Sequence, residues 1–483
     1  MDARKEIARG VLWLGSASLL SQLVDAVSIV IVLWFLDRAQ LGVATLAWSV
    51  AVLMEAFNGL GVGTAIVQAK ALDDRQLGTL YWYVMGIAVL AVAGLLIAAP
   101  FIAGFYETPE LTPMIRLSAF KLLFVGAALV PLQLSIRELQ FHRVGAVSTA
   151  ATLLNNVVKI ALAAAGYGAW ALVISHAIHG VFVLIGITLL SNYRPRWAFD
   201  FRSVRPQVLF GLNVAGSSVL FHFYRNVDYL LVGRLAGNAV LGVYRVAFDL
   251  AMGPAKALLD VVNGSSLPVM AKVADDRPKL AETFLWVTRT LGLVLAPVCT
   301  ILYFAADSLL KVAVSAEWQG AAPALRLLCI AAFVRSLAQA FPRLFHAANR
   351  PTWAIYESGL SLIIISGTLY AFLLGLGPQY AERAACFAWL AAYPLLLGVL
   401  LAFARRIMPL STSVYFGHWL PALAGSACMS LPLWAVARWV RLPAALELGC
   451  LIAVGLGVYW VFLRYGLGVQ LRDMPLRRPR ESQ

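Results

Sequence analysis

The chain has 483 residues, of which 61% are hydrophobic and only 13% are charged. Soluble globular domains carry about 25% charged residues, so this composition excludes a protein built of soluble domains. The formal net charge of +14 would suit a nucleic-acid-binding protein, but basic cytoplasmic loops give a membrane protein the same excess. We therefore expect a protein surrounded by membrane lipid, with no nucleic-acid partner.

Apolar runs of about 20 residues recur along the chain, and a helix of that length crosses a hydrocarbon core of about 30 Å. The first run lacks the small-residue cleavage pattern of a signal peptide and is expected to remain as a helix. The pattern predicts an all-α polytopic membrane protein of about 14 transmembrane helices, at roughly residues 11–36, 41–67, 79–105, 113–136, 146–166, 168–191, 208–235, 241–267, 283–306, 322–346, 353–375, 380–404, 418–437 and 445–466.

Basic residues are distributed unevenly between successive loops. Every second loop is rich in Lys and Arg, above all the loop at residues 192–207, as is the C-terminal tail. The loops between them hold only Arg38, Arg234, Lys311, Arg383, Arg438 and Arg441. Because cytoplasmic loops are the ones enriched in Lys and Arg, we expect both termini and the 192–207 loop to be cytoplasmic.

The chain contains an internal repeat. A shift of about 200 residues places Leu41-Gly42-Val43 on Leu241-Gly242-Val243. Since six helices return the chain to the cytoplasm, we expect two six-helix lobes related by a pseudo-two-fold axis along the membrane normal, as in alternating-access transporters. The predicted parts are an N-terminal lobe at 1–200, a C-terminal lobe at 201–410, two further transmembrane helices at 411–466 and a basic cytoplasmic tail at 467–483.

Ionisable residues deep in the expected spans are the candidates for a functional site. Each costs about 2.5–3.5 kcal/mol or more on insertion scales, so it faces a protein interior or a water-filled cavity. The eighth expected helix carries one polar stripe of two oppositely charged i, i+4 pairs, Arg245–Asp249 and Lys256–Asp260. The stripe either lines a cavity or pairs internally and holds helices together.

Further charges fall on the helices that the repeat makes equivalent to one another. The seventh helix carries His222, Arg225 and Asp228, and the first and second carry Asp25 and Glu55. We assign substrate binding in a central cavity to Arg225, Lys256, Arg245, Lys159, His222, Asp249 and Asp260. Asp25, Glu55 and Asp228 are candidates to bind a coupling proton or Na⁺; the alternative is that each neutralises a nearby Arg or Lys.

Catalytic and metal-binding patterns are absent from the sequence. It contains no Walker, G-x-S-x-G or H-E-x-x-H motif, so no catalytic residue is assigned. The five cysteines lie in separate apolar runs, and His176 and His179 have no carboxylate or cysteine at ligand spacing. We expect no metal, no cofactor beyond H⁺ or Na⁺, and hydrogen-bonded packing roles for the two histidines.

Three sequence stretches carry a family resemblance. They are Leu77-Gly78-Thr79-Leu80-Tyr81-Trp82, Arg137-Glu138-Leu139-Gln140-Phe141-His142-Arg143-Val144-Gly145, and Glu317-Trp318-Gln319-Gly320 followed by Pro323-Ala324-Leu325-Arg326-Leu327-Leu328-Cys329. Through them the chain resembles the Wzx-type polysaccharide flippases, in the colanic-acid and teichuronic-acid exporter branch of the multidrug/oligosaccharidyl-lipid/polysaccharide exporter superfamily.

This resemblance implies a flippase that moves undecaprenyl-pyrophosphate-linked oligosaccharide across the bacterial inner membrane by alternating access. Such a protein serves the assembly of surface polysaccharide (exopolysaccharide, capsule or O-antigen), with a polysaccharide polymerase and co-polymerase as partners. The family has no binding motif whose residues transfer to this chain, so the site assignments depend on the charges in the spans.

Two other functions are open. A cation-coupled drug or metabolite exporter would share the superfamily, and an intramembrane polymerase or ligase would act on the same lipid. A pocket for lipophilic cations is acidic and aromatic, whereas Arg225, Arg245, Lys256 and Lys159 favour an anionic substrate.

Overall fold

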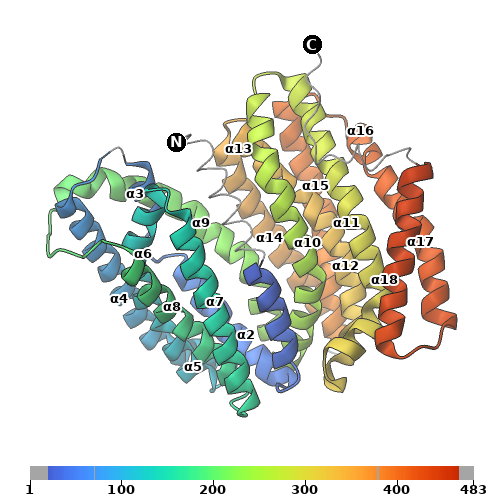
Figure 1. The fold of residues 1–483 in the computed structure, drawn as a ribbon, viewed down its shortest axis with the longest axis horizontal. Coiled ribbons are helices and arrows are strands. Elements are labelled where there is room, and N and C mark those ends of the chain that lie inside the picture. The colour runs from blue at the N-terminus through green and yellow to red at the C-terminus, as the bar shows by residue number, and fades with distance from the viewer. Residues whose placement is uncertain (1–19, 70, 378–379, 467–483) are drawn as a thin grey trace. The chain divides into compact units, whose positions relative to one another are not determined.

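The computed structural model describes residues 20–69, 71–377 and 380–466, without the side chains at 213–214, 217–218, 260–261, 263–265, 268 and 351. Within these ranges the secondary structure is helical and contains no strand (Figure 1). Ten helical segments of the described chain are long and apolar enough to cross a membrane. The predicted all-α membrane class is confirmed, whereas the count of 14 spans and the lobe symmetry remain predictions.

The expected spans that do not meet this criterion are the first, second, seventh and eighth. The first lies partly outside the described residues, and the helix Leu20–Val32 is its described part. The other three are the spans that carry Glu55, Arg225 and Arg245 among their charged residues. Their lower hydropathy follows from the same polar residues that make them candidates for a functional site.

The chain divides into two compact units, Met1–Gly242 and Val243–Gln483. After the helix Leu20–Val32, the first unit contains α2 (Arg38–Glu55), α3 (Val62–Gln68), α4 (Asp74–Phe105), α5 (Leu111–Ala119), α6 (Lys121–Arg137), α7 (Phe141–Ala164), α8 (Ala169–Leu190) and α9 (Phe201–Ala236). The first turn of α10 (Asn238–Lys272) also belongs to it.

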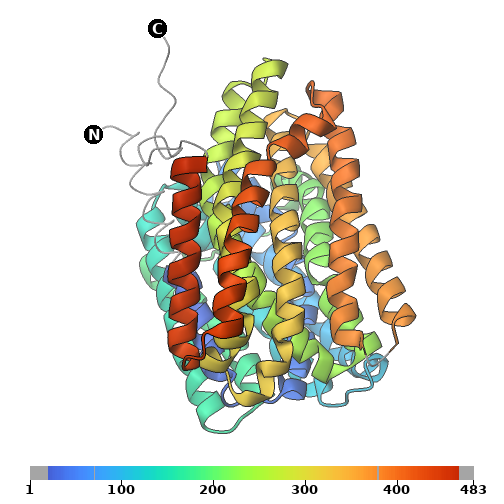
Figure 2. The same cartoon turned by 90° about the vertical axis from the view of Figure 1, so that its right-hand side faces the viewer.

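The second unit contains the rest of α10 and the helices that follow. These are α11 (Arg277–Ala313), α12 (Ala322–Ala338), α13 (Ala340–Ala347), α14 (Pro351–Gly375), α15 (Ala381–Ile407), α16 (Thr412–Gly417), α17 (Leu420–Trp439) and α18 (Ala444–Val461). The C-terminal helices α17 and α18 lie side by side and both contact α11 (Figure 2). Ile301 of α11, Met429 of α17 and Tyr459 of α18 are buried in their common core.

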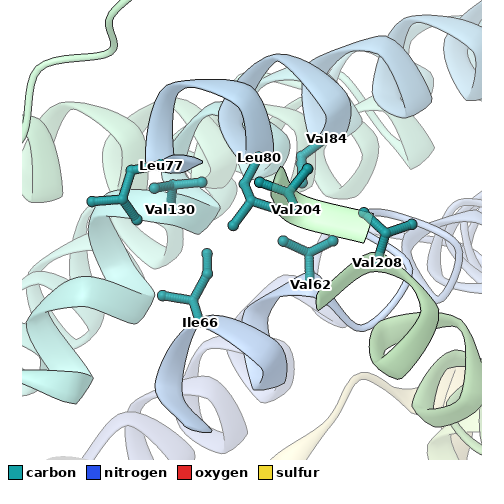
Figure 3. Packing of buried hydrophobic residues seen from close by; sticks show 8 residues of the cluster. All are labelled: Val62, Ile66, Leu77, Leu80, Val84, Val130, Val204 and Val208. Carbon is teal, nitrogen blue, oxygen red and sulfur yellow. The ribbon is translucent and has the colours of Figure 1, made fainter. Parts of the chain in front are cut away.

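The boundary between the units differs from the lobe boundary expected at residue 200. Helix α9 follows that expected boundary, yet it packs against α2, α3 and α4. Val204 and Val208 of α9 lie in one apolar cluster with Val62, Ile66, Leu77, Leu80, Val84 and Val130 (Figure 3). Burial of this apolar face joins the first half of α9 to the first unit.

The span expected at 41–67 is not one helix. It breaks between α2 and α3, where Gly59, Leu60 and Gly61 have positive φ values of 75°, 38° and 74°. Left-handed backbone cannot continue a right-handed helix. The sequence marks this place with Asn58-Gly59 and Gly61, which favour a turn. The spans expected at 113–136 and 322–346 are interrupted at a single residue each, Phe120 between α5 and α6 and Gln339 between α12 and α13. Both residues keep right-handed backbone, so each pair of helices remains one segment.

The repeated Leu-Gly-Val segments make reciprocal contacts inside the first unit. A Cβ on Gly42 would lie 1.9 Å from the Asn238 carbonyl oxygen, and a Cβ on Gly242 would lie 2.0 Å from that of Arg38. Only glycine permits so close a backbone approach. The two helix starts, Arg38 of α2 and Asn238 of α10, are separated by the same shift of 200 residues that relates the repeats.

Candidate functional site

A charged cluster lies where α2 ends at the helix break. Glu55 is the last residue of α2, and its Oε1 is 2.8 Å from Nζ of Lys121 on α6. The same oxygen is 3.3 Å from Nε2 of His176 on α8, and Lys121 Nζ is 3.1 Å from that nitrogen. The side chain of Lys121 is only 8% exposed and that of Glu55 24%. Three helices therefore meet at one ion pair in an apolar setting.

The helix break contributes further polar groups beside this cluster. Asn58 donates a hydrogen bond from Nδ2 to the Leu122 carbonyl oxygen, at 3.0 Å. The Trp48 ring meets the His176 ring edge-on, with centroids 6.4 Å apart. Irregular backbone at membrane depth occurs where protein or a water-filled cavity covers it. The contact with Lys121 supports the counter-ion role for Glu55, one of the two roles that the sequence left open.

Asp25 belongs to a second polar network, between the helix Leu20–Val32 and α7. Asn156 donates from Nδ2 to Oδ1 of Asp25 at 2.8 Å, and Ser28 donates to Oδ1 of Asn156 at 2.6 Å. Asn156 and Ser28 are buried, whereas Asp25 is exposed within its unit. Polar side chains of the helix Leu20–Val32 and of α7 therefore contact one another in the first unit.

The candidate residues of helix α9 differ in burial. Asp228 is 1% exposed and Asn226 is 4% exposed, and Asn226 donates from Nδ2 to the His222 carbonyl oxygen. Arg225 is exposed, and its guanidinium lies 5.3 Å from the Phe221 ring centroid. Lys159 on α7 is buried. Arg225 is thus the candidate cation of α9 whose side chain is exposed.

The polar stripe of the eighth expected span lies on α10. Arg245 donates from Nε to Oδ2 of Asp249, so the first expected i, i+4 pair is formed. Lys256, two turns further, is exposed in the second unit. Asp260 lies among the residues whose side chains the structure leaves undescribed, so the second expected pair stays a prediction.

Arg335 is a buried cation that lies among aromatic rings. It lies on α12, is buried, and has its guanidinium 5.4 Å from the Phe248 ring and 5.1 Å from the Trp389 ring. The Trp389 indole nitrogen donates to the Tyr244 hydroxyl at 2.6 Å. Cation–π contacts of this kind are worth more when desolvated. The rings come from α10 and α15, so Arg335 joins three helices of the second unit.

Glu357 was not identified from the sequence. It is 8% exposed on α14, and its carboxylate accepts hydrogen bonds from Ser361 Oγ at 3.1 Å and Ser358 Oγ at 3.3 Å. The signal available was a lone acid in an apolar span with a serine four residues later. A buried carboxylate held by hydroxyl groups is a natural place for a cation or a proton.

The described residues show no arrangement suited to a metal or to covalent catalysis. Among them, no three His, Cys, Asp or Glu side chains converge as metal ligands. Cys299, Cys329 and Cys386 are buried, whereas Cys428 is exposed and Cys450 is partly buried. The candidate residues can neutralise, hydrogen-bond and attract charged groups inside apolar helices, which is the chemistry of a transport pathway.

Solved membrane transporters share this fold. Lipid II flippase MurJ in an inward closed conformation matches with a TM-score of 0.74 at 13% identity, over 95% of this chain and 99% of that chain. An inward-facing multidrug resistance MATE family transporter of the MOP superfamily matches with a TM-score of 0.63 at 15% identity, over 80% and 95%. The fold is therefore that of a membrane transporter.

The sequence then defines the family within this fold. Residues 31–323 match the model of the Polysaccharide biosynthesis protein family, and the chain belongs to it. Teichuronic acid biosynthesis protein TuaB of Bacillus subtilis (strain 168) is 25% identical over 434 residues, 88% of each chain. Lipopolysaccharide biosynthesis protein WzxC of Escherichia coli (strain K12) is 23% identical over 352 residues, 72% of each. The resemblance inferred from the three motifs is confirmed, and the chain is a transporter, not an enzyme.

The contribution of the Glu55–Lys121 ion pair to the stability of the fold can be measured. Lys121→Met should lower the free energy of unfolding by about 3 kcal/mol, because it leaves a largely buried carboxylate without its cation. Glu55→Gln together with Lys121→Met should recover most of that loss. Thermal unfolding of the purified variants checks this, with the exposed Lys311→Met as the matched control. Equal destabilisation by the single and double variants would contradict a direct ion pair.

Proposed function

We propose that this protein moves undecaprenyl-pyrophosphate-linked oligosaccharide across the bacterial inner membrane by alternating access, for the assembly of surface polysaccharide. The observation that carries the proposal is the match of residues 31–323 to the Polysaccharide biosynthesis protein family, on a fold that lipid II flippase MurJ also has. The relative ExoT of Rhizobium meliloti (strain 1021), 23% identical over 304 residues, is itself named a succinoglycan biosynthesis transport protein.

The charges of the spans support an anionic substrate. Glu55 lies against Lys121, and Asp249 lies against Arg245, so two of the intramembrane acids are neutralised by cations inside their own units. Arg225 and Lys256 are the candidate cations whose side chains are exposed. A pyrophosphate group complements them, whereas the pocket of a drug exporter for lipophilic cations would be acidic.

Arg225 and Lys256 test the substrate assignment. Arg225→Ala and Lys256→Ala should each abolish surface polysaccharide while membrane levels of the protein stay near normal, because both residues attract the carrier's pyrophosphate. Arg225→Lys should keep part of the activity, since lysine retains the charge but loses the bidentate fork. Polysaccharide quantification and immunoblotting of membranes are the measurements.

Arg116→Ala is the matched control for these variants. Arg116 is an exposed arginine in the last turn of α5, and its loss should leave export nearly unchanged. Normal export by both Arg225→Ala and Lys256→Ala would assign the two residues to structural contacts instead of the substrate path.

Ion coupling is the next part of the proposal. Asp25, Glu55 and Asp228 stay candidates for a proton or Na⁺ site, and Glu357 joins them because it is buried with two serine hydroxyls as its hydrogen-bond partners. Transport into proteoliposomes should accelerate under one imposed ion gradient, and Asp228→Asn or Glu357→Gln should remove that acceleration. Equal rates under proton, Na⁺ and no gradient would end the coupling proposal.

Orientation and partners complete the proposal. Both termini and the 192–207 connector lie in the cytoplasm, because they belong to the Lys/Arg-rich set of loops. An alkaline phosphatase fusion after Arg202 should therefore be inactive in the periplasmic assay, and an active fusion would invert the topology. A polysaccharide polymerase and co-polymerase receive the product on the other side of the membrane.

A further inference from the structure

The irregular segment between α8 and α9, residues 191–200, is bound tightly to the beginning of α4, and we call it the strap. The Tyr193 hydroxyl donates to the Leu77 carbonyl oxygen at 3.2 Å. The Trp82 indole nitrogen donates to the Arg196 carbonyl oxygen at 3.1 Å. Burial raises the pKa of Tyr193, as expected for a phenol held against a helix. A connector that the sequence presents as a loose basic loop is thus fixed in place.

Thr79 and Gly78 complete the attachment of the strap. Thr79 Oγ1 accepts a hydrogen bond from the Asp200 backbone nitrogen at 3.0 Å, while its own proton is donated within α4 to the Arg75 carbonyl oxygen at 2.8 Å. A Cβ on Gly78 would lie 2.6 Å from the Arg196 carbonyl oxygen, so this position requires glycine. The family motif Leu77–Trp82 is therefore the part of α4 that holds the strap. Leu77 and Leu80 of the same motif belong to the apolar cluster of Figure 3.

The bound strap presents aromatic rings outwards. Trp197 stacks on Trp82 with ring centroids 3.9 Å apart and an interplanar angle of 18°. Trp197 is nevertheless 84% exposed, Phe199 74% and Phe201 47%. Several exposed aromatic side chains on a connector that is hydrogen-bonded to a helix are unfavourable in water and indicate an interaction site.

Basic side chains surround these rings. Arg194 hydrogen-bonds within the strap: it donates to the carbonyl oxygens of Ser191 and Tyr193 at 3.1 and 3.0 Å. Arg196 pairs with Asp74, but both side chains are more than half exposed, at 71% and 65%. Arg202 and Arg205 on the first turn of α9 are exposed. The surface is therefore aromatic and positively charged.

The position of the strap relative to the spans identifies its partner. Two apolar spans, Asp74–Phe105 and Ala169–Leu190, begin and end beside it, which places it at the depth of the lipid headgroups. Aromatic rings and basic residues favour that layer, and anionic headgroups attract basic clusters there. We propose that the strap is a binding surface for anionic phospholipid: Trp197, Phe199 and Phe201 insert among the headgroups, and Arg196, Arg202 and Arg205 contact their phosphates.

Fluorescence quenching tests this proposal without any oligosaccharide substrate. The purified full-length protein is placed in nanodiscs that contain increasing fractions of brominated phosphatidylglycerol or, in parallel, brominated phosphatidylcholine. The emission that is lost in Trp197→Phe reports on the strap. We expect this emission to be quenched at a lower fraction of the anionic lipid than of the zwitterionic lipid. In the Arg202→Gln/Arg205→Gln variant the half-maximal fraction of phosphatidylglycerol should rise about 30-fold.

Two further variants keep the test decisive. Lys311→Gln/Arg383→Gln removes two exposed cations far from the strap in sequence and should leave the quenching unchanged. Gly78→Leu should displace the strap and weaken quenching by both lipids. Equal quenching by the two lipids, or a preference that survives Arg202→Gln/Arg205→Gln, would overturn the proposal. Because no transport is measured, this outcome is independent of whether the protein is a flippase.

Discussion

A charged side chain that enters the hydrocarbon core loses its hydration, and only a partner charge, hydrogen bonds or enclosed water offset that loss. The polar residues of the spans follow this constraint. Glu55 meets Lys121 across α2 and α6, Arg245 meets Asp249 along α10, and Arg335 lies among aromatic rings. The first and third of these contacts join helices inside a unit, whereas the Arg245–Asp249 pair lies within α10; Arg225 is by contrast an exposed cation.

The same constraint explains why irregular backbone is confined to a few places. The break between α2 and α3 lies directly after Glu55 and contains Asn58, whose amide donates to the Leu122 carbonyl oxygen. The strap satisfies its backbone groups through Thr79 and Trp82 of α4. At the break a side chain of the irregular segment donates to a carbonyl of α6, and at the strap side chains of α4 bond the irregular backbone. The strap is therefore a packed element of the first unit between the end of α8 and the beginning of α9.

Features that depend on local periodicity were predictable from the sequence. The helical class follows from apolar runs, and the Arg245–Asp249 pair follows from a spacing of four residues on one helix. The Glu55–Lys121 pair was not predictable, because its members lie on different helices and only tertiary packing brings them together. The break at residues 56–61 was marked in the sequence by Asn58-Gly59 and Gly61, which favour a turn, but the apolar residues on both sides favour one continuous span. Glu357 was missed although Ser358 and Ser361 lie one and four residues later in the sequence, because serines are common in apolar spans and do not by themselves indicate a contact with a carboxylate.

The central claim is that this protein relocates a lipid-linked oligosaccharide and leaves its covalent structure unchanged. The most direct measurement reconstitutes the purified protein into proteoliposomes that carry a fluorescent oligosaccharide on undecaprenyl pyrophosphate. A membrane-impermeant reagent that modifies sugars then reports which leaflet holds the glycan over time. The account predicts protein-dependent movement of the glycan between leaflets, with recovered lipid of unaltered mass and a slower rate in Arg225→Ala. An unchanged leaflet distribution, or a lipid whose mass has changed, would contradict it.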